Sequence, residues 1–299
     1  MSETLTRREA LATALSLTVL PVVAVAADKP AEKPDDKPVV IPENALVVVV
    51  TDPLAAPLSC PCVKGYAQRD YDKLGKHLEA KLGRAVAVVY AETLAGALTK
   101  KTGGKADLVI GKDSVIRAAA PENKVTVTHL AALAGKDGKT TQTGLICVYA
   151  TDKALTPADL KGYTIYFGTS DAEEKSGAAV TIFKDFGVEL PAKLETCVAC
   201  PDGATKVIDE AKAGKKVATV ISSYAQPLLE GCGTIKKGDL RVVGETDPVP
   251  FVAAFATKTL SLADRDVVKA ALLEVGKNPD LCTALETKGG FVEPPAKKK

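Results

Sequence analysis

The chain has 299 residues, 46% hydrophobic and 25% charged, which excludes a disordered or collagen-like protein and predicts a large core in two parts. Lys and Arg total 39 against 37 Asp and Glu, so the formal charge of +2 is too balanced for a nucleic-acid-binding surface. Only 7 Tyr, 6 Phe and 2 His are present, with no Trp, which argues against an aromatic stacking platform and against a His-ligated metal centre.

Residues 1–27 have the features of an export signal. Arg7 and Arg8 precede an uncharged run over residues 10–27, which ends in a small-residue cleavage pattern at 24–26. We therefore predict a periplasmic or otherwise exported protein. Twin-arginine and Sec export both stay open, as does retention of the run as a membrane anchor. Residues 28–42 are rich in Pro and charge, which predicts a linker.

The next part of the chain alternates strand and helix patterns. The β-branched run 45–51 predicts a strand buried on both faces, and residues 66–82 carry apolar side chains at helical spacing. Strand patterns follow at 85–90 and 106–110, and a helix pattern opens near Asp113. This alternation of strand and helix patterns predicts βαβ units and a sheet covered on both faces.

A second set of elements begins at residue 143. Strand patterns lie at 143–150, 163–167, 217–221 and 251–257. A capping box lies at 156–159, and Ser170 with Glu173 would cap a helix that ends near 186. Further helices are predicted from Asp202 or Thr205 onward and over 222–231, 261–275 and 280–286.

Several segments, in this order, resemble the phosphate, phosphite and phosphonate branch of type II periplasmic solute-binding proteins. They are Ala106–Gly111, Ala158–Tyr163, Ser176–Gly177, Val217–Tyr224 and Gly244–Pro250. The resemblance implies an α/β fold of two lobes, each with a mixed, mostly parallel sheet, joined by a two-strand hinge. It places lobe 1 at 43–145 plus 250–290 and lobe 2 at 146–249, and it implies that the chain crosses between the lobes near 143–151 and 246–251. Separately, the composition of residues 291–299 predicts a basic disordered tail.

The resemblance also implies a function. It predicts a monomeric, non-enzymatic protein without a cofactor that closes over a small, anionic, phosphonate- or phosphate-like ligand and serves an ABC permease or a membrane sensor. Anionic ligand groups are expected at helix N-termini, where free backbone N–H groups donate hydrogen bonds to them. The candidate ligand-binding residues are Asp113, Ser114, Thr169, Ser170, Ser176, Ser222, Ser223 and Tyr224. Each could equally be a helix cap.

One segment departs from the family pattern. Where the family has Ser-Thr-Ser-Gly, this chain has Asp171-Ala-Glu-Glu-Lys-Ser-Gly177, which places Asp171, Glu173 and Glu174 near the expected anion site. Either these carboxylates face solvent in the first turn of a helix, or the ligand is not a dianion.

The seven cysteines allow three interpretations. Export favours disulfides, with Cys197 paired to Cys200 and Cys232 to Cys282. Alternatively, Cys60, Cys62, Cys197 and Cys200 could supply four thiolates to Cu or Zn in the cleft. Thirdly, Cys197-Val-Ala-Cys200 before a helix could act in thiol exchange, although thioredoxin-type flanks are absent. Cys147 lies in an apolar run and is expected to be buried.

Catalytic motifs are missing from the sequence. It contains no nucleophile-elbow, P-loop, zincin or dinucleotide-binding motif. This agrees with a binding protein rather than an enzyme.

Overall fold

The computed structural model describes residues 37–59 and 68–294. The predicted signal at 1–27, most of the linker, Cys60, Cys62 and residues 295–299 lie outside this range. All described residues belong to one compact unit, Glu32–Lys299.

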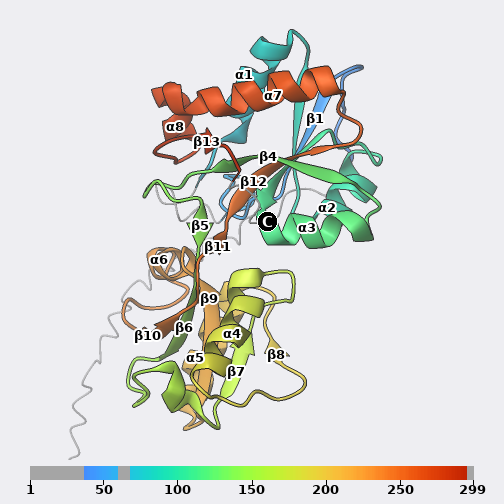
Figure 1. Ribbon diagram of the computed structural model, residues 1–299. Helices are drawn as coiled ribbons and strands as arrows, with labels where there is room; N and C mark the ends of the chain where they lie inside the picture. The colour runs from blue at the N-terminus through green and yellow to red at the C-terminus, as the bar shows by residue number, and fades with distance from the viewer. Residues whose placement is uncertain (1–36, 60–67, 295–299) are drawn as a thin grey trace, which may run out of the picture. The chain divides into compact units, whose positions relative to one another are not determined.

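The first sheet has six strands in the order β13-β4-β12-β3-β1-β2 (Figure 1). Its strands are β1 (Leu46–Val50), β2 (Val86–Tyr90), β3 (Leu108–Lys112), β4 (Val127–Leu133), β12 (Val252–Thr257) and β13 (Phe291–Val292). The pairs β1–β2 and β1–β3 are parallel, whereas β12 pairs antiparallel with both β3 and β4. The sheet is therefore mixed, because β12 enters from the returning part of the chain and runs opposite to β3.

Helices cover both faces of this sheet, as the uninterrupted apolar sequence of β1 requires. Leu46, Val48 and Val50 pack with α1 (Tyr71–Leu82), α7 (Leu262–Glu274) and α8 (Pro279–Ala284). Val47 and Val49 face the opposite cluster with α2 (Leu94–Gly96), the π-helical turn η2 (Ala97–Lys101) and α3 (Asp113–Glu122). Alternate side chains of one strand thus enter two separate cores.

The second sheet has five strands in the order β10-β6-β9-β7-β8. They are β6 (Gly144–Tyr149), β7 (Thr164–Phe167), β8 (Glu195–Thr196), β9 (Val217–Ser222) and β10 (Leu240–Glu245). One face packs against the 3-10 turn η3 (Pro157–Leu160) and α4 (Gly177–Asp185), the other against α5 (Cys200–Lys212) and α6 (Ala225–Gly231). Two of its four strand pairs are antiparallel, β10–β6 and β6–β9. The prediction of mixed sheets is confirmed, but "mostly parallel" is wrong for both.

Two short strands lie where the chain passes between the sheets. β5 (Thr141–Gln142) pairs antiparallel with β11 (Val249–Pro250). The outgoing crossing thus precedes the predicted segment 143–151, most of which forms β6 inside the second sheet. The strand predicted over 143–150 is confirmed as β6, which is paired on both edges.

Local helix signals hold in some places and fail in others. The Thr156 and Asp159 capping box forms, on a 3-10 turn. The predicted Ser170–Glu173 cap does not: residues 173–175 form the 3-10 turn η4 (Glu173–Lys175), and α4 begins at Gly177 without a side-chain cap. The described part of the predicted helix 66–82 begins at Tyr71, because the Asp70 carboxylate caps the N–H groups of Asp72 and Lys73.

Other predicted boundaries shift by a few residues. α5 begins at Cys200, before Asp202, and α6 begins at Ala225, because Ser222 is still paired in β9. Phe291, expected in a disordered tail, is buried in β13. Among the helices formed by the described residues, none combines the length and apolarity needed to cross a bilayer.

Candidate functional site

A buried ion pair joins the two sheets. The Lys112 ammonium lies 2.5 Å from Glu174 Oε1, and the side chains are 9% and 0% exposed. Lys112 ends β3 of the first sheet, and Glu174 belongs to η4 beside the second. Because removing two charges from water costs several kcal/mol per ion, such a pair persists only when further hydrogen bonds hold it.

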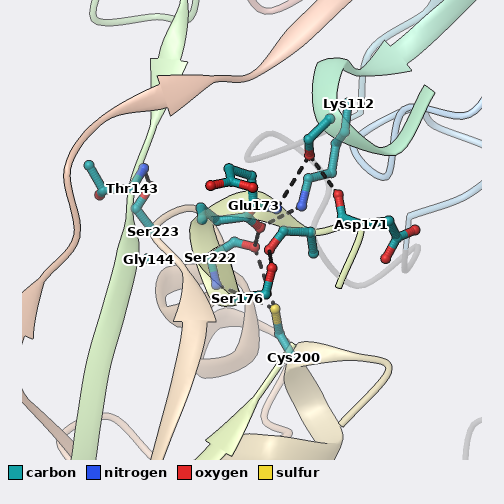
Figure 2. A network of polar contacts seen from close by, with 12 residues as sticks. Lys112, Thr143, Gly144, Asp171, Glu173, Ser176, Cys200, Ser222 and Ser223 are labelled. Atoms are coloured by element: carbon teal, nitrogen blue, oxygen red, sulfur yellow. Dashed lines mark hydrogen bonds and ion pairs between the residues drawn. The ribbon is translucent and has the colours of Figure 1, made fainter. Parts of the chain in front are cut away.

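Ser222 supplies one of these hydrogen bonds. Its hydroxyl donates to Glu174 Oε1 over 2.6 Å, from the carboxyl end of β9 (Figure 2). The second carboxylate oxygen, Glu174 Oε2, is buried and has no hydrogen-bond partner among the described residues. An acceptor left in this state costs about 1–3 kcal/mol of stability.

Close backbone packing positions Glu174. A Cβ atom built on Gly144 would overlap the carbonyl oxygen of Glu174 and lie 3.0 Å from its carbonyl carbon. Only glycine at the start of β6 therefore lets η4 lie directly against the second sheet. Likewise, a Cβ on Gly111 would overlap the hydroxyl of Thr51, so β3 can place Lys112 only with glycine before it.

A second contact between the same elements lies next to the ion pair. The Ser114 hydroxyl, in the first turn of α3, donates to the Asp171 carbonyl over 2.7 Å and accepts from the Glu173 N–H over 3.4 Å (Figure 2). Ser176 turns inward and donates to the carbonyl oxygens of Ala172 and Ser170. The hydroxyls of Ser114 and Ser176 thus fix the turn that presents Glu174.

Cys200 and Tyr224 complete the surroundings of the carboxylate. The Cys200 sulfur lies 3.7 Å from Ser222 Oγ and accepts from the Ser222 N–H over 3.5 Å. Tyr224 stacks on Phe251 with ring centroids 5.2 Å apart. Burial, then the nearby Cys200 and Glu174, raises the pKa of Tyr224 well above its ordinary value, so its hydroxyl stays protonated.

The predicted ligand residues separate into two groups. Ser114, Ser176, Ser222 and Tyr224 lie around Glu174, as described above. Asp113 instead pairs with Arg117 over 2.6 Å within α3, and its carboxylate lies 3.8 Å from the His129 ring. The Ser223 hydroxyl accepts from the Thr143 N–H over 3.3 Å. Thr169 and Ser170 lie on the turn after β7, with Ser170 exposed.

The three predicted carboxylates also differ in their environment. Glu173 is exposed and Asp171 is partly buried, whereas Glu174 is fully buried. The first-turn, solvent-facing interpretation therefore holds for Glu173 and is wrong for Glu174.

Both predicted disulfides are absent. Cys197, Cys200, Cys232 and Cys282 are free thiols, as is Cys147. Cys200 faces Ser222, the Cys232 sulfur lies against the Leu229 carbonyl of α6, and the Cys282 sulfur lies against the Val275 carbonyl, seven residues earlier in the chain. Each sulfur is thus directed toward a local neighbour rather than another sulfur. Burial, then Cys200, raises the pKa of Cys147 to about 12, as expected of a buried small side chain.

The predicted four-thiolate metal site falls partly outside the described residues, because it includes Cys60 and Cys62. Within residues 37–59 and 68–294, no group of three or more His, Cys, Asp and Glu side chains could hold a metal ion.

Sequence reasoning missed Lys112 altogether. The only sequence signal was its position, after the β-branched run of β3 and before the acidic start of a helix. Its partner lies 62 residues away, a pairing that no local pattern encodes.

Comparison with known proteins gives one family. A family model described as ABC transporter, phosphonate, periplasmic substrate-binding protein matches residues 65–296. No curated protein sequence matches the chain.

Three solved structures illustrate the shared fold. PhnD1 from Prochlorococcus marinus, in complex with methylphosphonate, gives a TM-score of 0.61 at 13% identity and covers 85% of this chain and 93% of its own. A binding-protein component of an ABC phosphonate transporter from Pseudomonas aeruginosa gives a TM-score of 0.60 at 14% identity, and the match covers 84% of this chain and 81% of that protein. An ATP-bound protein from Xanthomonas citri gives a TM-score of 0.60 at 14% identity, and the match covers 84% of this chain and 92% of that protein.

Proposed function

Because the chain belongs to the family of periplasmic substrate-binding proteins of phosphonate ABC transporters, we propose that it binds a small phosphonate- or phosphate-like anion beside Lys112 and Glu174 and delivers it to an ABC permease. The observation that carries the proposal is the buried oxygen Glu174 Oε2 at the junction of the two sheets, which has no hydrogen-bond partner among the residues that the structure describes.

The charges around this oxygen select the ligand. Lys112 supplies a cation beside this carboxylate. Glu174 is an acceptor and repels a fully ionised group, but it accepts from a protonated phosphoryl oxygen. The preferred ligand is therefore a monoanion that keeps one P–OH group. Such a ligand is compatible with the acidic segment 171–177, which replaces the Ser-Thr-Ser-Gly pattern of the family.

Binding would operate by closure. The site takes Lys112 and Ser114 from the first sheet and its helices, and Glu174 and Ser222 from the second. A ligand that contacts both groups stabilises the arrangement in which they lie together, with β5 and β11 as the connecting strands. We further propose that the protein acts as a monomer without catalysis, and that residues 1–27 direct its export.

Methylphosphonate and methanesulfonate provide a matched test, since both are tetrahedral anions with one methyl group and only the first can carry a proton on oxygen. We expect titration calorimetry of the purified protein to give binding of methylphosphonate about tenfold or more tighter than methanesulfonate, the difference expected for one unpaired buried group. Binding should weaken as rising pH removes the P–OH proton.

The variant Glu174→Gln tests the assigned residue. Its amide keeps the shape of the side chain and can donate to a fully ionised oxygen. The preference for methylphosphonate should therefore shrink toward equality. Equal affinities in the unsubstituted protein, or a preference that survives Glu174→Gln, would remove Glu174 from the site. No methylphosphonate binding at about 10 mM would refute the proposed ligand class.

A further inference from the structure

The two short strands that connect the sheets form a ladder of only two residue pairs. Gln142 of β5 lies opposite Val249 of β11, and Thr141 lies opposite Pro250 (Figure 1). Proline has no backbone N–H, so Pro250 donates no hydrogen bond to this ladder. The connection is therefore short and sparsely hydrogen-bonded, which allows the two sheets to rotate relative to each other about it.

Hydrogen bonds fix the chain on both sides of this ladder. On the side of the first sheet, the Phe251 N–H donates to the Thr140 carbonyl over 2.9 Å. On the side of the second sheet, the Ser223 N–H donates to the Thr143 carbonyl over 2.9 Å. A change in the angle between the sheets is therefore taken up by the ladder itself, of which Gln142 is part.

Gln142 is a buried amide without hydrogen bonds. Its side chain is 5% exposed, and neither its amide nitrogen nor its amide oxygen has a partner among the described residues. Both atoms are also shielded from solvent, so water does not replace the missing partners. Because an amide loses its hydrogen bonds to water on burial, an unpaired one raises the free energy of the arrangement that buries it.

Residues from both sheets surround this part of the hinge. Gln142 is one of the residues that line a pocket of about 260 Å³. Leu54 and Arg69 line it from the side of the first sheet, and Ser223 and Tyr224 line it from the end of β9 in the second. Moving the sheets apart separates these walls and lets water reach the hinge, where it can pair with the amide.

We infer that Gln142 acts as an opening element of the hinge. Its unpaired amide destabilises the joined arrangement, in which Lys112 contacts Glu174, relative to an arrangement with the sheets further apart. A ligand that holds the sheets together must offset this cost, so Gln142 lowers the affinity and favours release. The effect on affinity rests on the proposed function, whereas the bias toward opening needs no ligand.

The variant Gln142→Met tests the bias in the ligand-free protein, because methionine keeps the length of the side chain and lacks both amide groups. Lys112→Met, which removes the ion pair, should have a larger radius of gyration in small-angle X-ray scattering of the full-length protein. Adding Gln142→Met should return the radius toward that of the unsubstituted protein. Adding Gln226→Met should not, because Gln226 lies on α6 and its amide pairs with Glu230 over 3.3 Å.

A radius in Lys112→Met that Gln142→Met leaves unchanged would overturn the inference. Equal radii in the unsubstituted protein and in all these variants would also overturn it, because the sheets would then not separate at all.

Ligand binding gives a second test, on the single variant Gln142→Met. Titration calorimetry should show methylphosphonate and methanesulfonate both bound about tenfold tighter than by the unsubstituted protein, with their ratio unchanged. The ratio should persist because the substitution changes the cost of closure and not a ligand contact. Unchanged or weaker affinity, or a changed ratio, would refute the role of Gln142. Absence of binding to every protein tested would refute the proposed ligand class, and the scattering comparison alone would then decide on Gln142.

Discussion

Replacing Lys112 by Met measures the contribution of the buried ion pair that joins the two sheets. The substitution keeps most of the side-chain length and removes the charge. Among the described residues, this leaves the fully buried Glu174 carboxylate with only the Ser222 hydroxyl as a donor. Removing one partner of a buried pair costs about 3–5 kcal/mol. At about 2–4 °C per kcal/mol for a protein of this size, the melting temperature should fall by about 6–20 °C.

The assay is thermal and urea unfolding of the full-length protein, followed by circular dichroism. Lys81→Met is the matched control, because Lys81 pairs with Glu274 over 2.7 Å on the surface, where both side chains are about 45% exposed. An exposed pair contributes about 0–1 kcal/mol, so this variant should stay close to the unsubstituted protein.

A double substitution separates the pair from its parts. Lys112→Met with Glu174→Met replaces both charges by apolar groups, and should be destabilised by at least about 1 kcal/mol less than the sum of the two single variants. Additive losses, or a Lys112→Met protein as stable as Lys81→Met, would mean that the ion pair does not form in solution.

Three further predictions concern packing, pH and thiol chemistry. Gly144→Ala should lower stability by about 1–3 kcal/mol in urea unfolding, because the added methyl group displaces Glu174; an unchanged midpoint would contradict the close approach. Burial lowers the pKa of His129, so the unfolded chain binds the proton more readily and stability should fall as pH drops below about 6.5. The variant His129→Phe should reduce this dependence of stability on pH, measured as urea unfolding midpoints between about pH 5 and pH 8. An unchanged pH dependence would mean that other titrating groups cause it. With a pKa of about 12, the Cys147 thiol should resist iodoacetamide at about pH 8 until the protein unfolds, as mass spectrometry of trapped peptides would show. Native-state labelling of Cys147 at the rate of Cys232 would contradict its burial.

Short-range signals in the sequence were sufficient for the central strands and for several helix ends. The run 46–50 is apolar at every position, and it forms a central strand whose alternate side chains enter two cores. Thr156 and Asp159 form their capping box because both partners lie within one turn. The order of family-like segments also indicated the α/β fold and the family correctly.

Longer-range contacts overrode local signals at the candidate site. Ser170 and Glu173 have the spacing of a helix cap, yet the chain there forms a 3-10 turn that presents Glu174 to Lys112. Cys197 and Cys200 have the spacing of a disulfide, yet Cys200 lies beside Ser222.

By itself, the sequence determined the central strands β1, β3, β6, β9 and β12 and most of the long helices, since these depend on periodicity and neighbouring residues. Only the tertiary structure decided that Lys112 meets Glu174, that Gln142 and Arg69 share a pocket, and that β12 runs antiparallel beside β3. The physical reason is that burial and charge pairing depend on which distant segments pack together. The residues next to a carboxylate in the sequence do not determine whether it will face water or a buried ammonium group.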